Sequence, residues 1–188
     1  EIGACDWSSD VCSSDLTASA DQPLKGLVHL LEAVARLRGT GRDVTLTVLG
    51  RLREDGPTVR RLAALGLGEA VRFRSGLEEH EIRRLYAEAE IAVVPSLYEG
   101  FGLPAGEAMA CGVPVVSTTG GALPEVVGDA GVLVPPAAPE ALAGAIAALL
   151  DDPSRRAALG AAGLSRIHGQ FGWDRAARQL AAFYGALL

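Results

Sequence analysis

The 188-residue chain has few aromatic residues and no long uninterrupted apolar run. Hydrophobic residues make up 49% and charged residues 21%, which is typical of a folded globular domain and excludes a disordered chain. The most apolar window, residues 130–150, contains Glu140 and three prolines. A membrane span needs about 20 mostly apolar helical residues, so this window is not one. The length suits one domain with a substantial core.

An excess of positive charge is also missing. The 17 Lys and Arg residues stand against 23 Asp and Glu residues, which gives a formal net charge of −6 at pH 7. Because nucleic-acid binding requires a basic surface, we expect no nucleic-acid partner. Lys25 is the only lysine, and it directly precedes Gly26 at the expected start of a helix. A single lysine among arginines favours a specific role for its ammonium group, although a solvated helix-terminal charge is the alternative.

Only three cysteines occur, and two of them, Cys5 and Cys12, lie in a Ser/Asp/Cys-rich segment at the N-terminus. Residues 6–16 resemble the translation of a common sequencing adapter, and the segment has no signal-peptide pattern. We therefore expect residues 1–16 to be an artefactual leader without a fold; a natural irregular N-terminus is the alternative. On this hypothesis residues 17–188 form the domain, and Thr17–Ala20 are the tail of a truncated first strand. Cys111 is then the only cysteine of the domain, expected as a small buried hydrophobe, and no disulfide is indicated.

From Leu24 onward, apolar strands alternate with amphipathic helices. The patterns predict strands at 44–49, 71–74, 91–95, 113–117 and 132–134. They predict helices near 24–37, 58–65, 78–89, 104–111, 123–127, 139–151, 154–168 and 174–187. This alternation predicts an α/β fold with a doubly wound, Rossmann-like parallel sheet.

Small residues follow four of the expected strands, namely Gly50, Ser75-Gly76, Ser96 to Leu103 and Thr118 to Gly121. In open parallel sheets, ligands bind at the carboxyl ends of the strands. Ordinary turn chemistry explains any one of these glycines, but four neighbouring strand ends together favour a ligand site.

The segment 96–107 is the most informative part of the chain. It places Glu99 and Glu107 eight positions apart across a glycine-rich loop, and Pro104 opens a short helix. Backbone N–H groups of such a loop and helix start bind anions, and carboxylates accept hydrogen bonds from hydroxyls. The implied ligand is both phosphorylated and polyhydroxylated, as a nucleotide sugar is. A helix-first-turn acid at Glu107 and a loop cap at Glu99 are the structural alternatives.

Residues 17–188 resemble the C-terminal half of retaining glycosyltransferases of the GT-B fold, in the large group with a Glu-x7-Glu motif. The resemblance is carried by the segments 94–107, 107–116 and 120–127 and by the tail that begins at Phe171. It implies that Glu107 binds the ribose hydroxyls of the donor and that Glu99 contacts a hydroxyl of the transferred sugar. It further implies that backbone N–H groups of Gly100, Phe101, Gly102 and Leu103 face the diphosphate or the sugar.

The resemblance also implies that Lys25 binds the donor diphosphate and stabilises the leaving nucleoside diphosphate, so Glu99 and Lys25 are the candidate catalytic residues. Backbone atoms near Ser75 and Gly76 are expected to contact the base. Many members of the group carry an arginine five residues before the lysine, where this chain has Ala20. Either another group replaces that arginine or Arg51 supplies the charge.

Taken as a whole, these features predict a fragment of a glycosyltransferase that binds a nucleoside-diphosphate sugar for retaining transfer. We expect it to be inactive without an N-terminal half that supplies the acceptor site. The expected partners are the nucleotide sugar, an unknown acceptor and that half, through which any peripheral membrane contact would occur. A cytoplasmic location and no metal or other cofactor are expected.

Three alternatives remain. A nicotinamide-dependent dehydrogenase would need Gly-x-Gly-x-x-Gly after the first strand, and Gly100-Phe101-Gly102 lacks the third glycine. A GT-B-fold epimerase or phosphorylase would share the donor cleft. A non-catalytic nucleotide-binding module would bind the same ligand without turnover.

Overall fold

The computed structural model describes residues 12–17 and 22–187. It has an α/β fold whose strands are parallel. The strands are β1 (Cys12–Thr17), β2 (Val44–Leu49), β3 (Val71–Arg74), β4 (Ala92–Val94), β5 (Val115–Thr118) and β6 (Val132–Val134). Two parallel ladders, β1–β2–β3 and β4–β5–β6, lie side by side because β1 packs beside β4. The order 3-2-1 followed by 4-5-6 is that of a doubly wound nucleotide-binding sheet, so the predicted fold class is confirmed.

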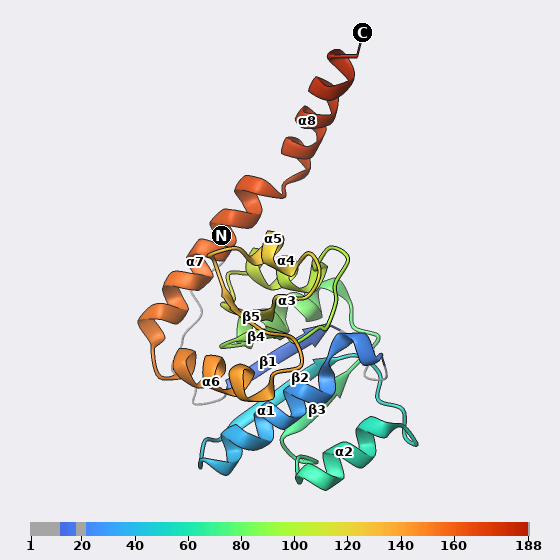
Figure 1. The fold of residues 1–188 in the computed structure, drawn as a ribbon, viewed down its shortest axis with the longest axis vertical. Coiled ribbons are helices and arrows are strands. Elements are labelled where there is room, and N and C mark those ends of the chain that lie inside the picture. Colours follow the sequence, from blue (N-terminus) through green and yellow to red (C-terminus); the bar gives the residue numbers. More distant parts are fainter. Residues whose placement is uncertain (1–11, 18–21, 188) are drawn as a thin grey trace.

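Helices cover both faces of the sheet (Figure 1). They are η1 (Pro23–Lys25), α1 (Leu27–Gly39), α2 (Pro57–Leu65), α3 (Glu79–Glu88), α4 (Leu103–Ala110), α5 (Leu123–Val127), α6 (Pro139–Leu150), α7 (Pro153–Gln170) and α8 (Trp173–Gly185). One buried cluster joins β2 to α1, α2 and α6, and a second joins α3, α4 and α5. Residues around β4 alternate between the clusters: Ile91 and Val93 enter the first, and Ala92 and Val94 the second.

The first strand differs from the expectation that residues 1–16 contribute no fold. Cys12 to Thr17 form β1, which pairs in register with Val44 to Leu49 of β2. A parallel ladder is made by backbone N–H and C=O groups, so a polar sequence without proline can occupy the position beside β2. Thr17 ends this strand, and the remainder of the expected strand tail, residues 18–20, lies outside the described residues.

Cys111 also differs from its expectation. It caps the C-terminus of α4 and is half-buried rather than buried, packed against the second cluster. This partial burial raises the pKa of the Cys111 thiol.

The last helix, α8, extends away from the sheet and its covering helices (Figure 1). None of its residues is buried, and Trp173, Leu180, Phe183 and Tyr184 are exposed apolar or aromatic side chains. Among the described residues, no helix is long and apolar enough to cross a membrane.

Candidate functional site

Three loops meet at the carboxyl edge of the sheet, and two of them, after β4 and β5, are among the strand ends at which the sequence predicts a ligand site. Backbone hydrogen bonds join them, since the Leu97 N–H donates to the Leu24 carbonyl at 2.7 Å and the Ala122 N–H donates to the Glu99 carbonyl at 2.9 Å. The loops are residues 22–26 after β1, 95–102 after β4 and 119–122 after β5. The loop after β4 is thus held from both sides.

Three glycines allow this close approach. A Cβ atom on Gly26 would lie 2.0 Å from the Pro95 carbonyl oxygen, and one on Gly121 would lie 2.2 Å from that of Glu99. A Cβ on Gly120 would meet the carbonyl oxygen of Leu97 at 2.5 Å. The sequence pattern indicates no partner for these glycines. The Gly-Gly pair that follows Thr119 after β5 indicated a close approach by a ligand, but in the structure it is a distant segment of the chain that comes close.

The candidate catalytic residues Lys25 and Glu99 contact each other at this edge. The Lys25 Nζ donates to Glu99 Oε1 at 2.6 Å, and the Ser96 Oγ donates to the same oxygen at 2.8 Å. Glu99 is 8% exposed and Ser96 is 2% exposed. The carboxylate is therefore desolvated but compensated by one cation and one hydroxyl. The structure thus brings the two candidate residues together. It also adds Ser96 as a hydrogen-bond donor to Glu99, a role that the sequence did not indicate.

Ser96 is itself fixed from β5. Thr118 Oγ1 donates to the Ser96 carbonyl, and the Gly120 N–H donates to Thr118 Oγ1 at 3.2 Å. Thr118 is fully buried. A buried, satisfied chain of hydrogen bonds of this kind fixes the loop in one arrangement.

Helix α4 begins immediately after the loop. Gly102 precedes it with φ 90°, a left-handed conformation that strongly favours glycine. The first-turn N–H groups of a helix have no partner within that helix, and Pro104 has no N–H to leave unpaired. The start of α4 is thus a place where an anion can be bound, beside the exposed Gly100 and Phe101.

Glu107 lies one turn further along α4, and it lines a cavity that neither Lys25 nor Glu99 lines. Its side chain reaches solvent, yet partial desolvation raises the pKa of its carboxyl group. It lines a cavity of about 600 Å³ between α4, α7 and α8. Phe101 and Phe171, which meet edge to face with ring centres 6.3 Å apart, also line this cavity. Among the described residues, no hydrogen bond or ion pair joins Glu107 to Lys25 or Glu99.

The remaining predicted site residues lie at the same edge but are not joined to the pair. Arg51 follows β2, and Ser75 and Gly76 follow β3; all three are exposed. None of them hydrogen-bonds Lys25 or Glu99 within the described part of the chain. Ala20, where the expected arginine is missing, lies outside the described residues.

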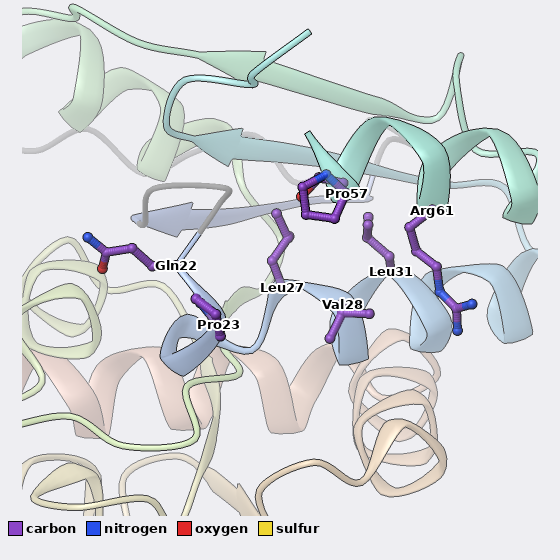
Figure 2. Close-up of a pocket in the computed structure, with 8 residues that line it drawn as sticks. Gln22, Pro23, Leu27, Val28, Leu31, Pro57 and Arg61 are labelled. Carbon is purple, nitrogen blue, oxygen red and sulfur yellow. The ribbon is translucent and has the colours of Figure 1, made fainter. Parts of the chain in front are cut away.

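A separate cavity of about 200 Å³ lies between the start of α1 and α2. Figure 2 shows Leu27 and Leu31 of α1 pointing toward Pro57 at the start of α2. None of the predicted site residues lines this cavity.

In the described ranges, no group of three or more His, Cys, Asp or Glu side chains could hold a metal ion. The expectation that the site uses no metal stays a prediction.

The order of the strands and the loops at their carboxyl edge define a class, the Rossmann-like α/β domains. Residues 16–166 match the family described as "Glycosyl transferases group 1". The chain belongs to this family.

Curated relatives match most of the chain. It is 49% identical over 170 residues to an MMP alpha-(1->4)-mannosyltransferase of Mycolicibacterium hassiacum, covering 89% of this chain and 41% of the relative. It is 39% identical over 173 residues to a D-inositol 3-phosphate glycosyltransferase of Segniliparus rotundus, covering 89% of this chain and 38% of the relative. The chain thus spans about two-fifths of the length of these relatives.

Solved structures share the fold. A sucrose-phosphate synthase of Thermosynechococcus elongatus is 34% identical with a TM-score of 0.79, covering 94% of this chain and 45% of that one. The C-terminal domain of a group 1 family glycosyltransferase of Francisella tularensis is 26% identical with a TM-score of 0.72, covering 87% and 86%. HepE of Anabaena in complex with UDP-glucose, at 24% identity and a TM-score of 0.80, covers 95% and 49% and supports the fold alone.

Proposed function

We propose that this chain is the donor-binding, C-terminal half of a retaining glycosyltransferase that uses a nucleoside-diphosphate sugar. The observation that carries the proposal is the contact between Lys25 and the desolvated Glu99 carboxylate beside the start of α4. It combines an anion-binding and a hydroxyl-binding group at one sheet edge. The match to a solved C-terminal domain along nearly its whole length supports the assignment to that half.

Lys25 and the start of α4 are the proposed diphosphate site. The Lys25 side chain is 24% exposed, and an ammonium group has three N–H donors, of which Glu99 takes one. The start of α4 contributes about 0.3–1 kcal/mol toward a nearby anion. Negative charge develops on the leaving nucleoside diphosphate as the glycosidic bond breaks, so these groups would stabilise the transition state.

The two glutamates are proposed to bind the two sugars of the donor. Glu99 would accept a hydroxyl of the transferred sugar and Glu107 the ribose hydroxyls, which places the sugar near Lys25 and the nucleoside along α4. Glu107 follows Leu103 by four residues along the helix, a rise of about 6 Å. That spacing suits a diphosphate at the helix start and a ribose one turn further on. Backbone groups of Gly100, Phe101 and Gly102 would line the path between the two.

The base is proposed to lie toward the ends of β2 and β3. Ser75, Gly76 and Arg51 are exposed there. Within the described residues, none of the three hydrogen-bonds Lys25 or Glu99. Arg51 is the proposed replacement for the arginine expected at position 20.

The acceptor is proposed to bind to an N-terminal half that closes over the donor. Closure would exclude water and position the acceptor hydroxyl, which favours transfer over hydrolysis. The chain alone is therefore proposed to bind donor without turnover. A cytoplasmic location goes with the proposal, because nucleotide sugars are charged and do not cross membranes unaided.

Isothermal titration of the chain with GDP-mannose and UDP-glucose tests the proposal, with the variants Lys25→Ala and Arg60→Ala. Loss of a charge-assisted contact should weaken binding roughly 10- to 100-fold in Lys25→Ala. Arg60 is an exposed cation of α2, and its removal should leave the affinity unchanged. Absence of binding to either donor, or an equal loss in both variants, would refute the donor site. Sugar transfer by the chain alone would refute its proposed inactivity.

A further inference from the structure

The carboxylate of Glu99 is held on one side only. Both hydrogen bonds that it accepts, from the Lys25 Nζ and from the Ser96 Oγ, end on Oε1. Among the described residues, no hydrogen bond ends on Oε2. One oxygen is thus committed to the protein and the other is left for a further donor group.

The two groups on Oε1 differ in what else they can do. The Lys25 ammonium is partly exposed and keeps two N–H donors for a ligand. Ser96 is 2% exposed, and its single O–H donates to Glu99. Ser96 is therefore too enclosed to contact a donor and dedicated to the carboxylate.

Hydrogen bonds on both sides of Ser96 fix its backbone and therefore the position of this hydroxyl. Its carbonyl accepts from Thr118 Oγ1, and its neighbour Leu97 is bonded to Leu24 through the backbone. The side-chain hydroxyl is thus delivered to Oε1 from a fixed point.

We propose that Ser96 is a positioning residue for Glu99. By holding Oε1, it turns Oε2 toward the hydroxyl of the donor sugar, and it keeps doing so when the diphosphate draws Lys25 away. This inference rests on the proposed role of Glu99 toward the sugar. It assigns Ser96 to recognition of the sugar alone and not to recognition of the nucleoside diphosphate.

The test is the affinity of Ser96→Ala for a nucleotide sugar and for the same nucleotide without its sugar, using the pairs GDP-mannose/GDP and UDP-glucose/UDP. Because Ser96 acts on the sugar only through Glu99, its loss should weaken binding of the nucleotide sugar by less than the loss of a direct charge-assisted contact, roughly three- to tenfold. Binding of the bare nucleoside diphosphate should stay within twofold of the parent chain. A role in folding alone would weaken both ligands together.

Ser117→Ala is the matched control. Ser117 is equally buried on the neighbouring strand, but its Oγ donates to the Val94 carbonyl and not to Glu99. The control should bind both members of each pair as the parent does. If Ser96→Ala and Ser117→Ala behave alike, the positioning role is refuted.

A double-mutant cycle with Glu99→Ala completes the test. Because Ser96 acts through Glu99, adding Ser96→Ala to Glu99→Ala should change nucleotide-sugar affinity by less than twofold. Additive losses would overturn the proposal while leaving the donor site intact. If the parent chain binds neither the nucleotide sugars nor the bare nucleotides, the proposed function falls, and this inference falls with it.

Discussion

At the scale of single residues, the buried carboxylate of Glu99 costs free energy that its neighbours must offset. An ion pair offsets the desolvation free energy of a buried carboxylate only when its geometry is good and further hydrogen bonds exist. Even then the pair adds little net stability. Glu99 meets both conditions through Lys25 and Ser96. The proposed role in ligand binding therefore explains its position at the carboxyl edge better than stabilisation of the fold does.

Gly121 tests how closely the loops must approach. Gly121→Ala would combine a strained φ of 63° with a Cβ placed 2.2 Å from the Glu99 carbonyl oxygen. Gly112→Ala is the control, because φ there is also positive, at 74°, but no atom lies within 4 Å of its Cβ. We expect a loss of about 1 kcal/mol in the free energy of unfolding for Gly112→Ala and at least about 2 kcal/mol more for Gly121→Ala, measured by urea denaturation. Equal losses would show that the loops move apart freely.

At the scale of elements, the sequence predicted most boundaries because apolar runs end at clear signals. The predicted strands at 44–49, 71–74 and 132–134 have the bounds of β2, β3 and β6. The predicted helix at 123–127 coincides with α5. Gly50 and Ser75 stop the first two strands at the residue after the apolar run. Most helix ends differ by one or two residues, as at α7, because the Asp152 side chain caps that helix one residue earlier than its apolar spacing indicates. The helix expected from residue 24 begins only at Leu27, because Gly26 adopts a left-handed φ of 68° that separates a short 3-10 turn from α1.

Helices α4 and α7 pack so closely that α7 needs a glycine at their contact. A Cβ on Gly160 would lie 2.2 Å from the Gly112 carbonyl oxygen, just beyond the end of α4. Gly160→Ala should therefore lower the melting temperature. The free energy of unfolding should fall by about 1–3 kcal/mol, because the added Cβ forces α7 and the end of α4 apart. Gly169→Ala, on the same helix with open space around its Cβ, should be neutral or stabilise by up to about 1 kcal/mol through helix propensity. If both substitutions stabilise, this contact is looser than the structure shows.

At the scale of the whole molecule, the sequence predicted the α/β sheet and the candidate residues at its carboxyl edge, but neither the Lys25–Glu99 contact nor the way the loops interlock. Gly26 and Gly121 contact backbone segments far away in the chain, and no local pattern identifies such partners. β1 was missed because its polar residues show no strand periodicity, whereas its pairing depends on the backbone alone. Ser96 was seen only as part of a motif, since its bond to Glu99 depends on the loop geometry.

Amide chemical-shift mapping shows directly where on the chain a donor binds. The ¹⁵N-labelled chain would be titrated with GDP-mannose and with UDP-glucose while backbone amide shifts are followed. The proposed donor site predicts saturable changes that are largest at Gly26, Gly100, Gly102 and Leu103, around the Lys25–Glu99 pair and the start of α4. Changes centred instead on Leu31, Thr58 and Arg61, around the cavity of Figure 2, would contradict it.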